Sequence, residues 1–149
     1  PLTPNAYGLV GVAANAIAPG KRPLSSMTPT FLETPYKVGI LGTPGGSRII
    51  SMVLIGILEF IAGHEPEAWV AAKRYHHQYL PDEVQFEQGG LTPAEQADLE
   101  RRGHTVREQS RNYGNMHAIL WDRHTGKVSA ASDPRGEGEA QVFAAPVPE

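Results

Sequence analysis

Hydrophobic and polar residues follow different periods along the chain, and each period predicts a different element. The stretches at 30–33 and 37–42 are short, contain β-branched and aromatic residues, and are three residues apart, as in a hairpin. The next apolar run places apolar residues three and four positions apart, which predicts a helix at 47–62. We expect its apolar stripe to lie in the core: Ile50, Val53, Leu54, Ile57 and Leu58.

The second half of the chain predicts two further helices and four further strands. Pro66 suits the first turn of a helix, where an N–H group is not needed. Thr92 and Glu95 form a capping box at the start of another helix, and Gly103 ends it. Residues 76–82 are expected to be extended or a turn. In chain order, we expect a helix at 65–75, a strand at 83–87, a helix between Thr92 and Gly103, and strands at 104–108, 116–122 and 127–131.

The order β-β-α-α-β-α-β-β-β indicates an α+β fold, with helices layered on a mainly antiparallel sheet. We expect a single domain at 1–149. Its first segment, 1–29, is rich in Pro and Gly and keeps no regular pattern, which is typical of an extended functional segment that lines a pocket. The last segment, 136–149, is expected to be a mobile tail.

Composition and charge exclude several kinds of function. The chain has 149 residues and no cysteine, which excludes disulfides, thiolate chemistry and cysteine-ligated zinc. The net charge of −3 indicates no nucleic-acid partner, although residues 1–48 carry +3 and lean towards anionic ligands. The apolar run at 49–61 is shorter than the roughly 20 residues of a membrane span, so we expect none.

The histidines do not predict a metal site. His76 and His77 are adjacent in an extended segment, so their side chains point to opposite faces. The other histidines show no ligand spacing, and we expect neither a metal ion nor a cofactor. Arg74 and residues 133–135 are interpreted as members of structural salt bridges or turns.

Two adjacent glycines stand where the predicted strand at 37–42 turns into the predicted helix. Without side chains, the N–H groups of Gly45 and Gly46 can approach a bound group closely, and the helix dipole adds partial positive charge. An oxyanion hole requires such donors. The alternative is a tight turn that only needs positive φ angles. A phosphate-binding loop is excluded because the G-x-x-x-x-G-K-[ST] spacing is absent.

Ser25 and Ser26 are adjacent hydroxyls in an electropositive, irregular segment. Paired hydroxyls and backbone amides can hold a carboxylate group without a full positive charge. A nucleophilic role is disfavoured because no G-x-S-x-G elbow surrounds either serine. The alternative interpretation is a serine-rich turn before a strand.

Five motifs together resemble the gamma-glutamyltransferase (gamma-glutamyltranspeptidase) family. They are NAYGLVG, PGKRPLSSMTPTF, GTPGGSRII, RYHHQYLPDEV and ASDPR, and they extend from about Asn5 to Arg135. The resemblance implies part of an α-β-β-α sandwich of the N-terminal-nucleophile hydrolases. It also implies a precursor that cleaves itself into a large and a small chain. The new N-terminal threonine of the small chain attacks the gamma-glutamyl amide of glutathione or a related compound, and water or an amine then takes the acyl group.

The resemblance also implies roles for individual residues at the matching motif positions. Gly45 and Gly46 would supply the oxyanion-hole N–H groups. Ser25 and Ser26 would hold the α-carboxylate of the glutamyl group. Met27, in the same motif, would line the pocket.

The nucleophile of that family has no counterpart in these residues. Residue 1 is Pro1, and no aspartate precedes Asp82, so the threonine and the acidic motif that grips the substrate amino group are expected upstream of Pro1. The chain is therefore interpreted as the C-terminal portion of a small subunit, inactive alone, with the large subunit of the same precursor as partner. Without those parts we expect unpaired strand edges and a bare apolar face. For a bacterial source, the resemblance implies a periplasmic or secreted enzyme.

Two other functions stay open at this point. One is a non-catalytic carboxylate-binding or assembly subunit that kept the pocket and lost the nucleophile. The other is a related amidase that acts on another acyl group, such as a beta-lactam side chain or a poly-gamma-glutamate. A threonine-initiated stretch upstream in the gene would favour the enzyme over the non-catalytic subunit.

Overall fold

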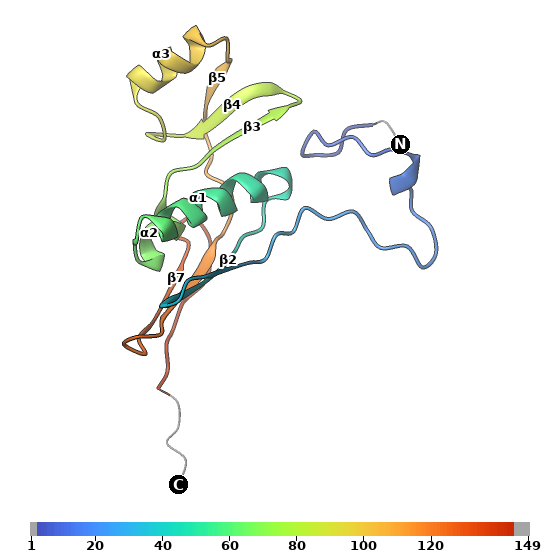
Figure 1. Ribbon diagram of the computed structural model, residues 1–149. Helices are drawn as coiled ribbons and strands as arrows, with labels where there is room; N and C mark the ends of the chain where they lie inside the picture. The colour runs from blue at the N-terminus through green and yellow to red at the C-terminus, as the bar shows by residue number, and fades with distance from the viewer. Residues whose placement is uncertain (1–2, 145–149) are drawn as a thin grey trace.

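The computed structural model describes residues 3–144, and the strands in this range form two sheets (Figure 1). The larger sheet is antiparallel throughout, in the order β1-β2-β6-β7. The first two strands form the predicted hairpin, with Thr30 opposite Leu41 and Glu33 opposite Val38. The strands of this sheet are β1 (Thr30–Glu33), β2 (Lys37–Gly42), β6 (His117–Asp122) and β7 (Val128–Ser132).

Two helices pack against one face of the larger sheet and form the core with it. They are α1 (Ile49–Ile61), preceded by a 3₁₀ turn at Gly46–Arg48, and α2 (Pro66–Ala71). Trp69 is fully buried between them, with its ring edge-on to Phe60 at 5.5 Å. The core contains Leu41, Ile49, Met52, Val53, Trp69, Val70, Met116, Ala118, Leu120 and Ala131. The prediction of an α+β fold with helices layered on a mainly antiparallel sheet is therefore confirmed.

The smaller sheet differs from the sequence prediction. It contains β3 (Tyr75–Tyr79), β4 (Asp82–Glu87) and β5 (Val106–Gln109), with α3 (Pro93–Arg101) between β4 and β5 in the sequence. The prediction of one helix over 65–75 was wrong at its end, because α2 stops at Ala71 and the chain then becomes extended. Residues 76–79, expected to be extended or a turn, pair with β4, and β4 pairs in parallel with β5.

The local signal at the start of α3 is confirmed. The hydroxyl of Thr92 accepts from the N–H of Glu95, and the carboxylate of Glu95 accepts from the N–H of Thr92, which is the predicted capping box. A further 3₁₀ turn, Ala13–Asn15, lies in the N-terminal segment.

Within residues 3–144, none of the helices has the length and apolarity that crossing a bilayer requires. The tail expected at 136–149 lies partly, at 145–149, outside the described residues.

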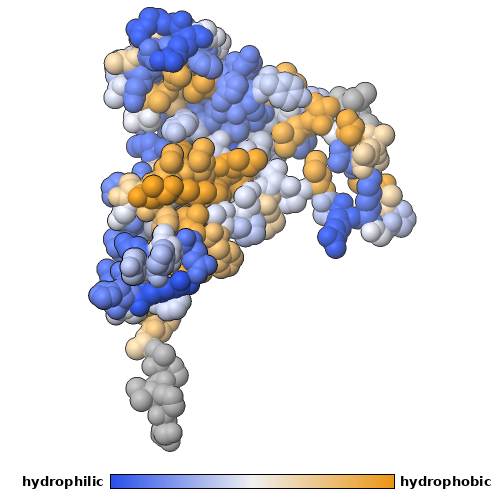
Figure 2. Space-filling model, viewed as in Figure 1, coloured by the Kyte–Doolittle hydropathy of each residue, from blue (hydrophilic) through white to orange (hydrophobic). Residues whose placement is uncertain are grey.

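The apolar stripe of α1 does not lie entirely in the core. Val53 is buried, but Ile50, Leu54 and Leu58 are 63%, 51% and 49% exposed, so the core prediction was wrong for these three. The helix is apolar on most of its sides, and the larger sheet, α2 and β3 cover only part of it. Its buried residues are Ile49, Met52, Val53, Ile55 and Gly56. The opposite side forms a hydrophobic band along α1 (Figure 2). This band agrees with the expected bare apolar face.

The larger sheet also has an exposed apolar face, on the side away from α1 and α2. Phe31, Ile119 and Trp121 on this side are 72%, 42% and 45% exposed. Within residues 3–144, β1 and β7 each pair on one edge only. Unpaired edges and a bare sheet face are expected of a fold whose remaining layers come from elsewhere.

Candidate functional site

The turn between β2 and α1 holds two glycines in conformations that other residues rarely adopt. Gly45 has a φ angle of 152° and Gly46 one of 59°. A Cβ atom at Gly45 would come within 2.5 Å of Met52 Cε, and one at Gly46 within 2.6 Å of the Tyr7 ring. Both the backbone conformation and the close neighbours therefore require glycine here. The tight-turn interpretation is sufficient to explain why the residues are glycines.

The turn geometry does not explain where the two N–H groups find acceptors. Among the contacts within residues 3–144, neither Gly45 N nor Gly46 N donates a hydrogen bond. The next amides turn into the helix, where Arg48 N donates to Gly45 O at 3.2 Å and Ile49 N to Gly46 O. Two free donors at the positive end of a helix dipole are suited to stabilise a negative oxygen atom.

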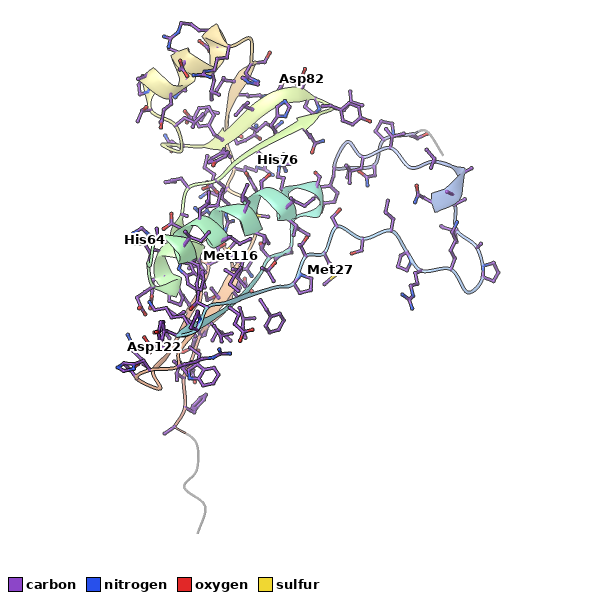
Figure 3. All side chains as sticks on the ribbon, in the orientation of Figure 1. Met27, His64, His76, Asp82, Met116 and Asp122 are labelled. Carbon is purple, nitrogen blue, oxygen red and sulfur yellow. The ribbon has the colours of Figure 1, made fainter. Side chains whose placement is uncertain are left out.

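A cavity of about 480 Å³ lies beside this turn and brings two of the predicted site residues together. Met27, from the N-terminal segment, and Gly45, from the turn, both line it. Figure 3 shows Met27 on this segment below the start of α1. The cavity is lined by Met27, Thr28, Pro29, Gly42, Thr43, Pro44, Gly45, Ile49, Asn115 and His117.

The predicted serines lie next to the cavity but do not line it. Ser25 is exposed, and its hydroxyl accepts from Met27 N at 3.1 Å, so it shapes the backbone before Met27. Ser26 is half-buried, and its carbonyl oxygen accepts from the Thr28 hydroxyl at 3.0 Å. Gly46 does not line the cavity either, and the Tyr7 ring lies against the position that a Cβ atom on Gly46 would take.

The cavity also contains polar residues that sequence analysis did not select. Asn115 and His117 come from the start of β6, which lies beside β2, so that His117 pairs with Gly42. The side-chain oxygen of Asn115 is buried and has no hydrogen-bond partner within residues 3–144. No local motif marks these residues, because a strand pairing over more than seventy positions brings them to the cavity.

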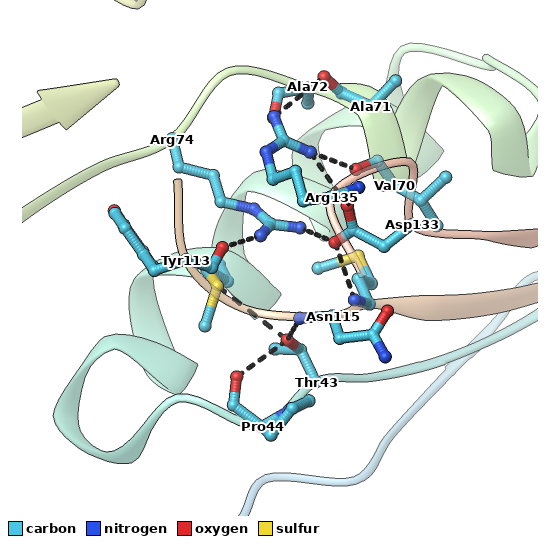
Figure 4. A network of polar contacts seen from close by, with 12 residues as sticks. Thr43, Pro44, Val70, Ala71, Ala72, Arg74, Tyr113, Asn115, Asp133 and Arg135 are labelled. Carbon is cyan, nitrogen blue, oxygen red and sulfur yellow. Dashed lines mark hydrogen bonds and ion pairs between the residues drawn. The ribbon is translucent and has the colours of Figure 1, made fainter. Parts of the chain in front are cut away.

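A buried ion network lies close to Thr43 and Pro44, the residues before the glycine turn (Figure 4). The guanidinium of Arg74 pairs with Asp133, whose side chain is fully buried. Arg135 binds Glu87 in a bidentate pair, with both N···O distances at 2.8 Å, and also contacts Asp133 at 3.2 Å. The structural interpretation of Arg74 and residues 133–135 is therefore confirmed. Glu87, the fourth member, was not predicted.

Hydrogen bonds set the charge state of Asp133 and link the network to the turn. Burial alone would raise the pKa of this carboxyl, but the N–H groups of Met116 and Arg135 and the side chain of Arg74 lower it below its ordinary value. Asn115 precedes Met116 in the chain, and its backbone N–H donates to the Thr43 hydroxyl at 3.2 Å. That hydroxyl donates to Pro44 O at 3.0 Å, immediately before the glycines.

The adjacent histidines point to opposite faces, as predicted. His76 is buried against Ser51 of α1, whereas His77 is exposed and contacts Asp82 at 2.8 Å. In the part of the chain from residue 3 to 144, no group of three or more histidines and carboxylates could hold a metal ion.

Comparisons with known proteins show which family the chain is similar to. The gamma-glutamyltranspeptidase family matches residues 1–143. A glutathione hydrolase proenzyme of Pseudomonas aeruginosa is 45% identical over 146 residues, and that of Escherichia coli is 42% identical over 137 residues. These matches cover 93% and 91% of this chain but only 25% and 23% of the two relatives. The chain thus spans about a quarter of the length of these curated relatives.

Solved structures match the fold as well as the sequence. A T380A mutant of Helicobacter pylori gamma-glutamyltranspeptidase aligns with a TM-score of 0.84 and 39% identity, over 91% of this chain and 75% of that one. The Pseudomonas nitroreducens gamma-glutamyltranspeptidase complexed with L-DON aligns with a TM-score of 0.80 and 40% identity, over 97% and 76%. On the extent of the family match and the identity to these relatives, the chain belongs to the gamma-glutamyltranspeptidase family.

Proposed function

We propose that this chain is the C-terminal portion of the small subunit of a gamma-glutamyl hydrolase or transferase. The complete enzyme cleaves gamma-glutamyl amides such as glutathione through an acyl-enzyme on an N-terminal threonine, and passes the acyl group to water or an amine. We place that threonine, whose own free amine serves as the base, in the part of the precursor that these residues do not cover. The proposal is supported by the family membership and by the glutathione hydrolase relatives.

The catalytic part of this proposal rests on the geometry of the turn that contains Gly45 and Gly46. Gly45 borders a cavity together with Met27, and the N–H groups of both glycines donate to no acceptor within residues 3–144. When the threonine attacks the amide, the carbonyl oxygen becomes negative, and these two amides stabilise it. One such donor contributes about 3 kcal/mol to transition-state stabilisation.

Substrate recognition is assigned to the segment before β1. Ser25 and Ser26 hold the α-carboxylate of the glutamyl group, and Met27 lines the pocket for its carbon chain. In the described chain both serine side chains lie next to the cavity rather than in its lining, so they bind the carboxylate at the cavity mouth. The hydroxyl of Ser25, which already accepts from Met27 N, can at the same time donate to a carboxylate oxygen.

The large subunit of the same precursor is the proposed partner. It and the upstream part of the small subunit complete an α-β-β-α sandwich by covering the exposed sheet face at Phe31, Ile119 and Trp121. This chain alone is therefore inactive. We further propose that the enzyme works in the periplasm or outside the cell, as expected for a bacterial member of the family.

The test uses the full-length proenzyme and gamma-glutamyl-p-nitroanilide. The processed enzyme should release p-nitroaniline, and the 149-residue chain alone should not. Replacing Ser25 and Ser26 together by Ala should raise KM strongly, whereas Ser110→Ala, at an exposed position outside the cavity, should not. An unchanged KM in the double variant would remove the carboxylate role, and absence of turnover by the processed enzyme would refute the proposal.

A further inference from the structure

The side-chain amide of Gln78 forms hydrogen bonds with four residues, of which Tyr7 and Ser47 are distant in the chain and His76 and Leu80 are local. Its oxygen accepts from the Ser47 hydroxyl at 2.8 Å and lies 2.8 Å from His76 Nε2. Its nitrogen donates to the carbonyl oxygen of Tyr7 at 2.8 Å and to that of Leu80. Because both carbonyls can only accept, the amide orientation is fixed: its nitrogen must face Tyr7 and Leu80.

This orientation also fixes the proton on His76. The Gln78 oxygen is an acceptor, so His76 Nε2 must carry the hydrogen that it shares with this oxygen. Nδ1 then accepts from the Ser51 hydroxyl at 2.7 Å. The ring is 6% exposed between β3 and α1 (Figure 3), and burial lowers its pKa, which favours the neutral form. The donors in this chain therefore all point the same way: the Ser51 hydroxyl donates to His76, and His76 donates to Gln78.

The two partners Tyr7 and Ser47 both adjoin Gly46. Ser47 is the next residue in the chain, and the Tyr7 ring lies against the Cα atom of Gly46. Gly8 packs against Leu80, where a Cβ atom would come within 2.5 Å of the carbonyl oxygen. In Figure 1, most of the segment before β1 extends away from the two sheets and returns to them near the start of α1.

We propose that Gln78 is a positioning residue that holds Tyr7 and Ser47 against Gly46 and so keeps the Gly46 amide in one orientation. The inference rests on the proposed function, in which this amide stabilises the developing oxyanion. Such a donor contributes its full stabilisation only when it is aimed at the oxygen before the reaction begins. Gln78 does not touch the substrate; it acts through Tyr7 and Ser47.

Two substitutions in the full-length proenzyme separate positioning from general stability. Gln78→Glu keeps the shape and both acceptor contacts but cannot donate to Tyr7 O, and Gln78→Met removes all the hydrogen bonds. The control is Gln85→Met. Gln85 lines a small cavity together with Gln78 and pairs with His76 across β3 and β4. It accepts from Arg48 at 2.8 Å and, within residues 3–144, forms no hydrogen bond with Tyr7.

Both Gln78 variants should lower kcat for gamma-glutamyl-p-nitroanilide between about 10- and 100-fold, as a misplaced catalytic group does, with a much smaller change in KM. Rates are normalised to the amount of processed small chain. Gln85→Met should keep its kcat. An unchanged kcat in Gln78→Glu, or an equal loss in Gln85→Met, would overturn the inference even if the Gln78 variants melt at a lower temperature.

A second measurement does not depend on turnover. Trypsin should cleave after Lys21, in the segment that Gln78 attaches through Tyr7, several times faster in Gln78→Glu than in Gln85→Met or the unaltered protein. Equal cleavage rates would refute the attachment. If the unaltered enzyme shows no turnover, the proposed function fails, while this cleavage comparison still decides whether Gln78 holds the segment.

Discussion

The ring of Tyr7 lies so close to Gly46 that a Cβ atom on the glycine would come within 2.6 Å of Tyr7 Cδ1. The φ angle of Gly46, 59°, independently disfavours any other residue. A side chain at position 46 is therefore disfavoured both by the Tyr7 ring and by the backbone φ angle. An added methyl group must move either the ring or the turn, and either movement reorients the Gly46 amide.

Gly46→Ala in the processed enzyme is expected to lower kcat by about 100- to 1,000-fold, the usual loss for one oxyanion-hole donor. Turnover of gamma-glutamyl-p-nitroanilide measures it. Gly63→Ala is the matched control, because Gly63 also has a positive φ angle, 83°, but nothing lies within 4 Å of its Cβ position. It should lose stability and keep kcat. Equal losses of kcat in both variants would attribute the effect to backbone strain alone.

Asp133→Asn is expected to lower the free energy of unfolding by about 3–5 kcal/mol, because it leaves Arg74 buried without its counter-charge. Urea denaturation of the assembled enzyme measures the change. Asp98→Asn is the control: Asp98 pairs with Arg101 and Arg102 at the surface, and its loss should change stability by less than about 1 kcal/mol.

The effect of Asp133→Asn should also depend on pH. The pKa of Asp133 is lowered in the folded protein, so its charge stabilises the fold above the ordinary aspartate pKa. That contribution is lost as the pH falls through the lowered pKa. The difference in free energy of unfolding between the unaltered enzyme and Asp133→Asn should therefore shrink in strong acid. A difference that stays constant into strong acid would contradict the charge argument.

Most helices and strands could be predicted from local pattern, and the exceptions have physical causes. The hairpin of β1 and β2 agrees with its prediction residue for residue, and the capping box places α3. By contrast, β3 contains two tyrosines, two histidines and a glutamine, so its alternation of buried and exposed positions leaves no hydropathy signal. The apolar pattern of α1 surrounds most of the helix and therefore does not tell which side faces the sheet.

The candidate site was predictable only where its residues lie in one local motif. Gly45 was marked by its own turn and Met27 by its place in a motif that resembles the family, and the structure brings both to one cavity. Asn115 and His117 reach that cavity through the pairing of β2 with β6, which no local pattern encodes. The same holds for Gln78, whose partners Tyr7 and Ser47 are 71 and 31 positions away.

His76 predicts a second dependence of stability on pH. Burial lowers its pKa, with smaller contributions in the same direction from Arg48 and His77, against a hydrogen bond to Gln78 that raises it. The unfolded chain then binds more protons than the folded one as the pH falls below the ordinary histidine value of 6.5, so stability decreases.

His76→Asn should reduce this loss of stability between pH 7 and the lowered pKa. The melting temperature of the assembled enzyme, measured across that range, tests it. Ser110→Ala, which changes an exposed residue without a titratable group, should leave the slope unchanged. A slope that is the same in unaltered enzyme and His76→Asn would show that His76 titrates alike in the folded and unfolded states.

Assembly with the large subunit should depend on the sheet face that α1 and α2 leave uncovered. Ile119 and Trp121 are 42% and 45% exposed there, and a lysine between two packed sheets would be buried without a partner. Ile119→Lys in the full-length proenzyme should therefore prevent the two chains from copurifying after processing, or should block processing. Val142→Lys makes the same change at a residue that is 53% exposed beyond β7, and it should assemble normally. If Ile119→Lys assembles as well as this control, the exposed sheet face is not the contact with the large subunit, and the hydrophobic band of Ile50, Leu54 and Leu58 along α1 becomes the surface to substitute next.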